Sequence, residues 1–147
     1  MNLNNPTIRP AVLGDTVRVT ELCLQLGYKV LENDIRKRLQ KFMEKEQTAT
    51  FIADGGGVIL GWIQVGIRSS LESGNLPEIT GLVVDESARG SGIGKALVLK
   101  GEEWTRNMGY NTIRVRTNII REETHNFYKK IGFEEKKRQI VFQKKLI

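Results

Sequence analysis

The sequence predicts an α/β fold in which a mixed, mostly antiparallel twisted sheet of six to seven strands is flanked by about four helices. Short runs of β-branched and aromatic residues alternate with longer stretches whose apolar residues recur at helical spacing. Residues 78–117 read as a strand, a helix and a strand, which requires a right-handed parallel crossover. The strands on either side of this unit are joined by hairpins or short helices, so the sheet is expected to be mixed.

The N-terminal half is expected to contain three strands and two helices. The strands are residues 7–10, 49–53 and 58–67, the last two forming a hairpin around Gly55, Gly56 and Gly57. Asp15 can cap a first helix that Gly27 ends, and Asn33 can cap a second. The apolar faces of these helices are Val19, Leu22, Cys23 and Leu26, and Ile35, Leu39, Phe42 and Met43. Residues 68–77, rich in serine and glycine, are expected to form a loop.

The C-terminal half is expected to contain three more strands and two more helices. The strand 78–84 leads into a helix whose apolar stripe runs from Ile93 to Met108, and Gly109 follows it. A strand over 112–117 comes next, and a short helix is stopped by Gly132. Residues 139–146 are expected to form a closing strand.

Composition and charge favour one soluble, cytoplasmic domain that spans residues 1–147. No apolar run approaches the roughly 18 residues of a membrane span, and the first ten residues lack the apolar segment of a signal peptide. The single cysteine, Cys23, excludes an internal disulfide and a cysteine-based zinc cluster, and no metal site is expected. The net charge of +6 comes largely from two local clusters without interleaved aromatic residues. This pattern favours solvated faces and an anionic small ligand over a nucleic-acid partner.

The most informative segment is the glycine-rich turn that follows the strand 78–84. Glycines at positions 90, 92 and 94 remove the Cβ atoms that would hold an oxyanion away from the backbone. The free N–H groups of the following helical turn, together with the helix dipole, attract a phosphate group. An open α/β sheet binds its ligand at the carboxyl ends of such strands, so this turn is expected to lie at the mouth of a site.

Two familiar nucleotide motifs do not fit this turn. A P-loop needs a glycine five positions before Gly94 and a serine or threonine after Lys95, but Arg89 and Ala96 occupy those positions. A dinucleotide fingerprint has a different glycine spacing and lies near the first strand of its fold. The alternative in which the glycines merely tighten a corner is weaker, because three alternate after an arginine.

Three landmarks resemble the GNAT N-acetyltransferase superfamily. Arg89-Gly90-Ser91-Gly92-Ile93-Gly94 resembles its acyl-CoA pyrophosphate signature, Gly109-Tyr110 precedes the next strand, and the segment from Asn126 to Phe133 resembles the family's Tyr-x-x-x-Gly-Phe motif. The resemblance implies an acyl-CoA N-acyltransferase fold with a central parallel pair of strands splayed apart, with Gly81 at a bulge that starts the splay. It also implies that acetyl-CoA is the co-substrate. The implied cofactor-binding residues are the amides from Arg89 to Lys95 (Arg89, Gly90, Ser91, Gly92, Ile93, Gly94, Lys95) for the pyrophosphate and Leu82, Val83 and Val84 for the pantetheine arm.

The chemistry implied by the resemblance is attack of a primary amine on the thioester of acetyl-CoA. Tyr128 stands at the position of the family's general acid and would protonate the leaving thiolate. Glu78 is a candidate base; the alternative is that Glu78 is only a solvated carboxylate at the end of a strand. A backbone amide near Val83 would bind the negative charge that develops on the carbonyl oxygen. Many family members carry an asparagine seven residues before the tyrosine, where this chain has Arg121, so Asn118 is the expected substitute cofactor contact.

The acceptor is left open by the sequence. In this fold the two N-terminal helices, their connection over residues 27–31 and the loop 68–76 would line the acceptor groove, and their charges are mixed. The acceptor is therefore a small-molecule or protein amine. The alternative function is a non-catalytic acyl-CoA-binding regulatory module with a nucleic-acid partner. A membrane partner is not expected, and exposed Val141 or Phe142 would indicate a homodimer.

Overall fold

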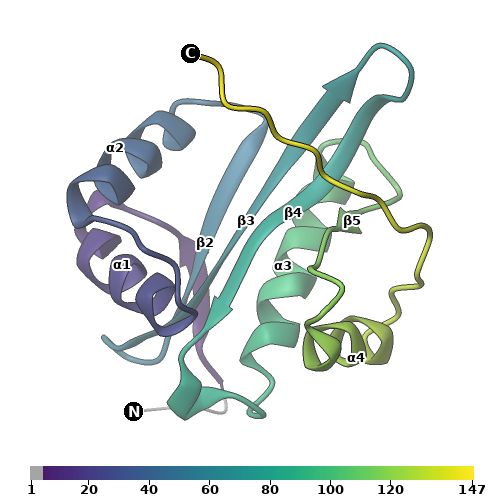
Figure 1. The fold of residues 1–147 in the computed structure, drawn as a ribbon. Helices are drawn as coiled ribbons and strands as arrows, with labels where there is room; N and C mark the ends of the chain where they lie inside the picture. Colours follow the sequence, from purple (N-terminus) through teal and green to yellow (C-terminus); the bar gives the residue numbers. More distant parts are fainter. Residues whose placement is uncertain (1–4) are drawn as a thin grey trace. The chain divides into compact units, whose positions relative to one another are not determined.

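The computed structural model describes residues 5–147, and the chain consists of two compact units. The first unit ends at Arg116 and the second runs from Thr117 to Ile147. Figure 1 shows the elements of both in chain order. The first unit contains a β-sheet with helices on its two faces, and the second contains one helix followed by residues in neither helix nor strand.

The sheet of the first unit has five strands that neighbour each other in sequence order. They are β1 (Thr7–Pro10), β2 (Thr48–Asp54), β3 (Ile59–Ser70), β4 (Gly74–Val84) and β5 (Arg114–Val115). The first three pairings are antiparallel and form a meander. β4 and β5 are parallel and are joined through the helix between them. The predicted mixed and mostly antiparallel sheet is therefore confirmed.

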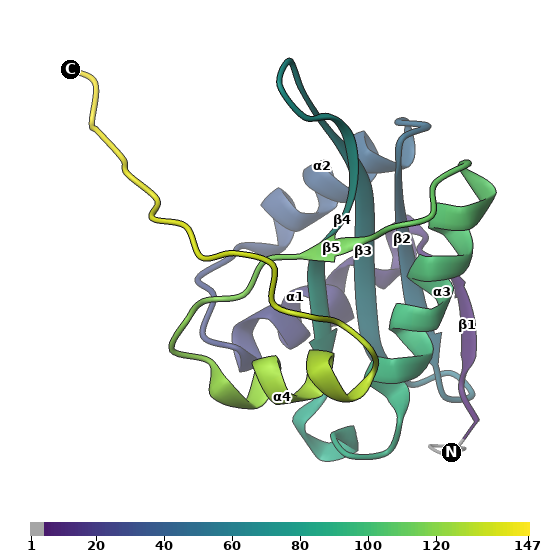
Figure 2. The same cartoon turned by 90° about the vertical axis from the view of Figure 1, so that its right-hand side faces the viewer.

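Three helices cover the sheet of the first unit (Figure 2). Helices α1 (Thr16–Gln25) and α2 (Glu32–Met43) lie on one face, and α3 (Ile93–Asn107) lies on the other. Short 3-10 turns, Leu13–Asp15 and Glu86–Ala88, precede α1 and α3. The core on the side of α1 and α2 contains Ala11, Val19, Cys23, Leu39 and Ile52, with Trp62 packed against it. On the other side Leu97 and Val98 of α3 are fully buried, as are Ile63 and Val65 of the sheet.

The second unit contains α4 (Glu122–Lys130). Acidic Glu122 and Glu123 lie in its first turn and Lys129 and Lys130 in its last, so both ends carry charges that stabilise the helix dipole. Gly132 follows the helix with a positive φ of 99°, as predicted for its stop signal.

The sheet differs from the prediction in three ways. It has five strands among the described residues rather than six to seven, because residues 139–146 belong to no strand. The strand expected over 112–117 is limited to Arg114 and Val115. The parallel pair lies at one end of the strand order and not at its centre.

Several boundaries also move. Residues 68–77 are not a loop: β3 continues to Ser70 and β4 begins at Gly74, because the two strands pair with each other as far as Ser70 and Gly74. Helix α2 begins at Glu32, so Asn33 lies inside it and does not cap it. The Asp15 side chain does not cap α1 either. Its carboxylate instead accepts hydrogen bonds from Arg9 at 2.8 and 2.9 Å and from the amide of Val12 at 2.8 Å.

Candidate active site

The edge of β4 is open along its C-terminal half. β5 pairs with β4 at Glu78 and Ile79, and no later residue of β4 pairs with it within the described part of the chain. At the same point the register with β3 shifts: Val65 pairs with Ile79 and Gln64 with Gly81, which leaves Thr80 as an extra residue. A bulge of this kind increases local twist and ends pairing. The backbone from Gly81 to Val84 therefore has an edge that can pair with another extended chain.

Gly81 lies beside this bulge, although the extra residue is Thr80 and not Gly81 as predicted. A Cβ at Gly81 would lie 2.7 and 2.8 Å from ring carbons of Trp62. Real Cβ atoms do not approach that closely, so glycine is required for the indole of Trp62 to pack against the strand. The buried indole Nε1 of Trp62 has no hydrogen-bond partner among the described residues.

The glycine-rich turn leads from β4 into α3 and has the predicted form. Gly90 and Gly92 have φ values of 79° and 86°, and Gly92 is the residue that precedes α3. A Cβ added at either position would meet no atom within 4 Å, so the space above the turn is open. The first amide of α3 that bonds to a backbone acceptor is that of Ala96, which donates to the carbonyl of Gly92. The amides of the preceding turn are thus available to an anion.

Some side chains of the turn hold its conformation, and others are exposed to solvent. Ile93 is 1% exposed and anchors the start of α3 in the core. The hydroxyl of Ser91 donates to the carbonyl of Ala88 and closes the turn on itself. Arg89 and Lys95 are exposed, so both cations can reach a ligand at the turn.

Asp85, the last residue before the turn, is fixed to α1 by a network that the sequence did not predict. Its buried carboxylate accepts hydrogen bonds from Arg18 and from Gln25, the latter at 3.2 Å, and from the amide of Ser87 at 3.2 Å. The side chain of Gln25 also accepts from the amide of Glu86 at 3.1 Å. These α1 partners lie 60 or more residues from the turn, so no local pattern indicates them. The one local signal is that Arg18 and Gln25 lie seven residues apart, on one face of α1.

The Asp85 network makes stability depend on pH. Burial alone would raise the pKa of the Asp85 carboxyl, but hydrogen bonds from the Ser87 amide, Gln25 and Arg18 together hold that pKa below its usual range. A carboxyl whose pKa is lower in the folded state stabilises the fold above its unfolded pKa of about 3.9, and this stabilisation is lost as pH falls through the folded pKa.

Asp85→Asn is therefore expected to lower the free energy of unfolding by about 1–3 kcal/mol at pH 7, because the partly buried Arg18 guanidinium loses its counter-charge. Between pH 5 and pH 3 the variant should lose less stability than the wild type. Urea denaturation at both pH values measures this. The exposed neighbour Glu86 provides the control: Glu86→Gln should behave as the wild type, and equal acid sensitivity of Asp85→Asn and the wild type would contradict the prediction.

Glu78 is not the solvated carboxylate at a strand end that the alternative interpretation described. It lies inside β4, is 8% exposed, and forms an ion pair with Arg116 in which Nε and Oε1 are 2.6 Å apart. It pairs in register with Gly66, on the sheet face that also carries Trp62. The arginine therefore orients the carboxylate on the side of the sheet covered by α1 and α2.

Within the second unit, Tyr128 is 6% exposed and lies in an aromatic cluster. Its ring packs edge-to-face on Phe127 and on Phe133, with centroids 5.0 and 5.2 Å apart. Burial raises the pKa of the Tyr128 phenol to about 12, so the group is protonated at neutral pH. It is therefore a proton donor under those conditions.

Asn118 and His125 hold the turn before α4. The side-chain oxygen of Asn118 accepts from the amide of Ile120 at 3.2 Å, and its carbonyl accepts from the amide of Arg121 at 3.0 Å. The same carbonyl is 2.9 Å from Nε2 of His125. In this arrangement His125 stabilises the turn, and the amide nitrogen of Asn118 is the part of that side chain left for a ligand.

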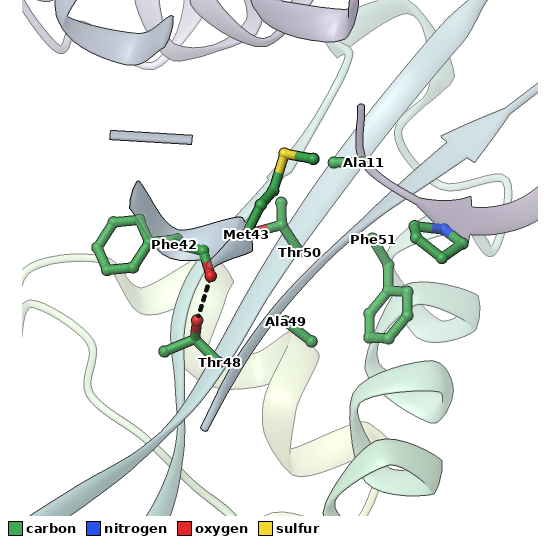
Figure 3. A pocket seen from close by; sticks show the side chains of 8 residues that line it. Ala11, Phe42, Met43, Thr48, Ala49, Thr50 and Phe51 are labelled. Atoms are coloured by element: carbon green, nitrogen blue, oxygen red, sulfur yellow. Dashed lines mark hydrogen bonds between the residues drawn. The ribbon is translucent and has the colours of Figure 1, made fainter. Parts of the chain in front are cut away.

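A separate hollow of about 280 Å³ lies on the first unit between the end of α2 and β2 (Figure 3). Its lining residues are Pro10, Ala11, Phe42, Met43, Thr48, Ala49, Thr50 and Phe51. The hydroxyl of Thr48 donates to the carbonyl of Phe42 at 2.9 Å and ties the end of α2 to the strand. None of the predicted site residues lines this hollow.

Neither a membrane-spanning helix nor a metal cluster is found over residues 5–147. No helix in that range is both long and apolar enough to cross a lipid bilayer. The same residues contain no group of three or more His, Cys, Asp or Glu side chains placed to hold a metal ion.

Comparisons with known proteins find a matching family, related sequences and similar folds. The model of the acetyltransferase (GNAT) family matches residues 18–133. An aminoglycoside N(6')-acetyltransferase type 1 of Stenotrophomonas maltophilia is 27% identical over 143 residues, which cover 94% of this chain and 92% of the relative. An aminoalkylphosphonate N-acetyltransferase of Salmonella typhimurium is 34% identical over 80 residues, 54% of this chain and 52% of the relative. A solved aminoglycoside N-acetyltransferase in complex with CoA has a TM-score of 0.87 at 23% identity, covering 97% of this chain and 96% of its own.

Proposed function

The chain belongs to the GNAT acetyltransferase family, and from this premise we propose that residues 1–147 act as one N-acetyltransferase domain. The reaction moves the acetyl group of acetyl-CoA to a primary amine of a small molecule or protein. The amine nitrogen attacks the thioester carbonyl carbon, the carbon–sulfur bond breaks, and an amide and the CoA thiol are formed. The observation that carries the proposal is the open strand edge of β4 followed directly by the open amides of the glycine turn.

Acetyl-CoA fits these features in the same order along the chain. An extended pantetheine arm can hydrogen-bond to the free backbone edge from Gly81 to Val84 as an added strand would. The amides between Arg89 and Lys95 then receive the pyrophosphate, and the side chains of these two residues add positive charge. The Asp85 network holds the junction between the two binding segments.

Two proton transfers are needed. A free alkylamine is mostly protonated at neutral pH, so a base must accept its proton, and we assign this role to Glu78, directly or through a water. The leaving thiolate must gain a proton, and we assign its donor as Tyr128, whose phenol is held in the protonated form by burial. A backbone amide on the free edge of β4, around Val83, stabilises the negative charge that develops on the carbonyl oxygen. Asn118 is the proposed further contact to the cofactor.

The charges on the α1 and α2 face of the sheet bear on the acceptor. Glu78 of β4 faces α1 and α2, and the strand register pairs it with Arg114 of β5. Arg116 forms an ion pair with Glu78 and balances its charge. Arg68 lies two residues beyond Gly66 on the same face of β3. Among these four charged residues positive charge exceeds negative charge, which favours an acid group over a polycation. We therefore infer an acceptor amine that also carries a carboxylate, phosphate or phosphonate, rather than a polycationic aminoglycoside.

The proposed function is tested by titrating the protein with acetyl-CoA in a calorimeter and then measuring thiol release with a panel of amines. The panel holds aminoglycosides, polyamines, amino acids, aminoalkylphosphonates and lysine peptides. We expect acetyl-CoA to bind, thiol to be released with at least one amine, and acid-bearing amines to show a kcat/KM about tenfold above that of polycations. Binding without turnover across the panel would instead support the non-catalytic acyl-CoA-binding module. A preference for aminoglycosides would overturn the acceptor assignment alone.

A further inference from the structure

The side-chain amide of Gln25 joins the end of α1 to the chain that leaves β4. Its Nε2 donates to the Asp85 carboxylate at 3.2 Å, and its Oε1 accepts from the amide of Glu86 at 3.1 Å. Both polar atoms of one side chain are thus bonded to two consecutive residues. Gln25 precedes them by 60 and 61 residues and is the last residue of α1, so these contacts come from outside the turn.

Residues 85–92, which connect β4 to α3, have bonds of two kinds. The amide of Ala88 donates to the carbonyl of Asp85 at 2.9 Å, which closes the 3-10 turn on itself. Such a bond does not fix where the turn lies. Its place is set by the amide of Asp85, which donates to the carbonyl of Leu60 at 2.8 Å, by the burial of Ala88, and by Gln25.

The Asp85 carboxylate does not depend on Gln25 alone. The guanidinium of Arg18 donates to this carboxylate and, through Nε, to the carbonyl of Ile59 at 3.1 Å. The amide of Ser87 donates to it as well. Loss of the Gln25 amide would therefore leave the charge of Asp85 paired, and it would release the start of the turn from α1.

The position of residues 85–88 sets the spacing between two binding segments. In the proposed function, on which this inference rests, residues 81–84 hold the pantetheine arm of acetyl-CoA and the amides of residues 89–95 hold its pyrophosphate. The two groups belong to one molecule. Once one group is bound, a protein that already holds the right spacing binds the other as an intramolecular event and gains affinity. A junction that moves loses this gain, although each segment is unchanged.

We propose that Gln25 is a positioning residue for acetyl-CoA, because its side-chain amide fixes the start of the glycine turn at the spacing that lets one cofactor reach both segments. It acts through Asp85 and Glu86, and not through a contact of its own with the cofactor. Helix α1, which the sequence places beside the acceptor, thereby also serves the cofactor.

The first test is Gln25→Met, which keeps the length of the side chain and removes both hydrogen bonds. Calorimetry should show the dissociation constant of acetyl-CoA rising about tenfold, since two hydrogen bonds and the fixed spacing are lost. The KM for acetyl-CoA should rise in parallel, and kcat at saturating acetyl-CoA should stay within about twofold of the wild type. Gln25→Glu, which places a second carboxylate beside Asp85, should weaken binding at least as much.

Gln47→Met is the matched control, because Gln47 is an exposed glutamine between α2 and β2. It should leave the dissociation constant, KM and kcat unchanged. If Gln25→Met binds acetyl-CoA as tightly as Gln47→Met, Gln25 does not position the cofactor. A wild type that binds no acetyl-CoA would instead contradict the proposed function, so the two failures can be told apart.

The second test separates positioning from damage to one binding segment. Pantetheine and ADP each supply one part of the cofactor, the arm or a pyrophosphate, and amide shifts of the ¹⁵N-labelled chain measure their affinities. Gln25→Met should bind each fragment with a dissociation constant within about twofold of the wild type, because neither fragment spans the junction. A fragment that loses as much affinity as acetyl-CoA does would overturn the proposal.

Discussion

Gly92→Ala is expected to weaken acetyl-CoA binding at least about tenfold while lowering the free energy of unfolding by about 1 kcal/mol. Gly92 precedes α3 in the left-handed region, with φ at 86°. An alanine there either strains the backbone or shifts it, and its methyl group enters the open space above the amides. Both effects hold a phosphate away from the N–H groups. Calorimetric titration with acetyl-CoA and urea denaturation measure the two quantities separately.

Gly56→Ala is the matched control for this variant. Gly56 also has a positive φ, 85°, and an added methyl group would meet no atom within 4 Å, but it lies in the turn between β2 and β3. The loss of stability should be similar in the two variants, and the loss of affinity should be confined to Gly92→Ala. Equal affinities in both variants would exclude the turn from cofactor binding.

Tyr128→Phe is expected to lower kcat about 100-fold or more and to leave the dissociation constant of acetyl-CoA within about twofold of the wild type. The variant keeps the ring that packs on Phe127 and Phe133, so the aromatic cluster is retained. It removes the phenolic proton that the leaving thiolate needs. Steady-state thiol release with the best amine of the panel measures kcat.

The raised pKa of Tyr128 gives this prediction a pH signature. A general acid acts in its protonated form, and with a pKa of about 12 the phenol stays protonated as pH rises to 10. Wild-type kcat should therefore show no decline between pH 8 and 10 from this group. Tyr110→Phe, which removes a phenol from the first unit, should retain wild-type turnover. If Tyr128→Phe does the same, Tyr128 is not the acid.

Local signals in the sequence predicted the order of elements and the glycine turn. Apolar spacing located the four α-helices found over residues 5–147. The turn was recognisable because the left-handed conformations at Gly90 and Gly92 need glycine. The hairpin around Gly55–Gly57 was predicted for the same reason. In each case the residues that determine the structure are close together in the chain.

Long-range contacts determine what the sequence did not predict. Residues 68–77 look like a loop by composition, yet strand pairing from Ile67 with Pro77 to Ser70 with Gly74 makes them a hairpin. The Arg18–Asp85 and Arg116–Glu78 ion pairs join residues 67 and 38 positions apart, so no pattern along the chain indicates them. The segment 139–147 has strand-forming residues, but pairing also needs a partner edge, which composition cannot supply.

The central claim is that the backbone amides of the glycine turn bind the pyrophosphate of acetyl-CoA, and amide chemical shifts test it most directly. The ¹⁵N-labelled chain is titrated with acetyl-CoA and, separately, with pantetheine, which lacks the pyrophosphate. The account predicts that acetyl-CoA gives its largest shifts at the amides of residues 89–95, and that pantetheine moves residues 81–84 and leaves the turn unchanged. Saturation with acetyl-CoA that leaves the amides of 89–95 in place while others move would contradict it.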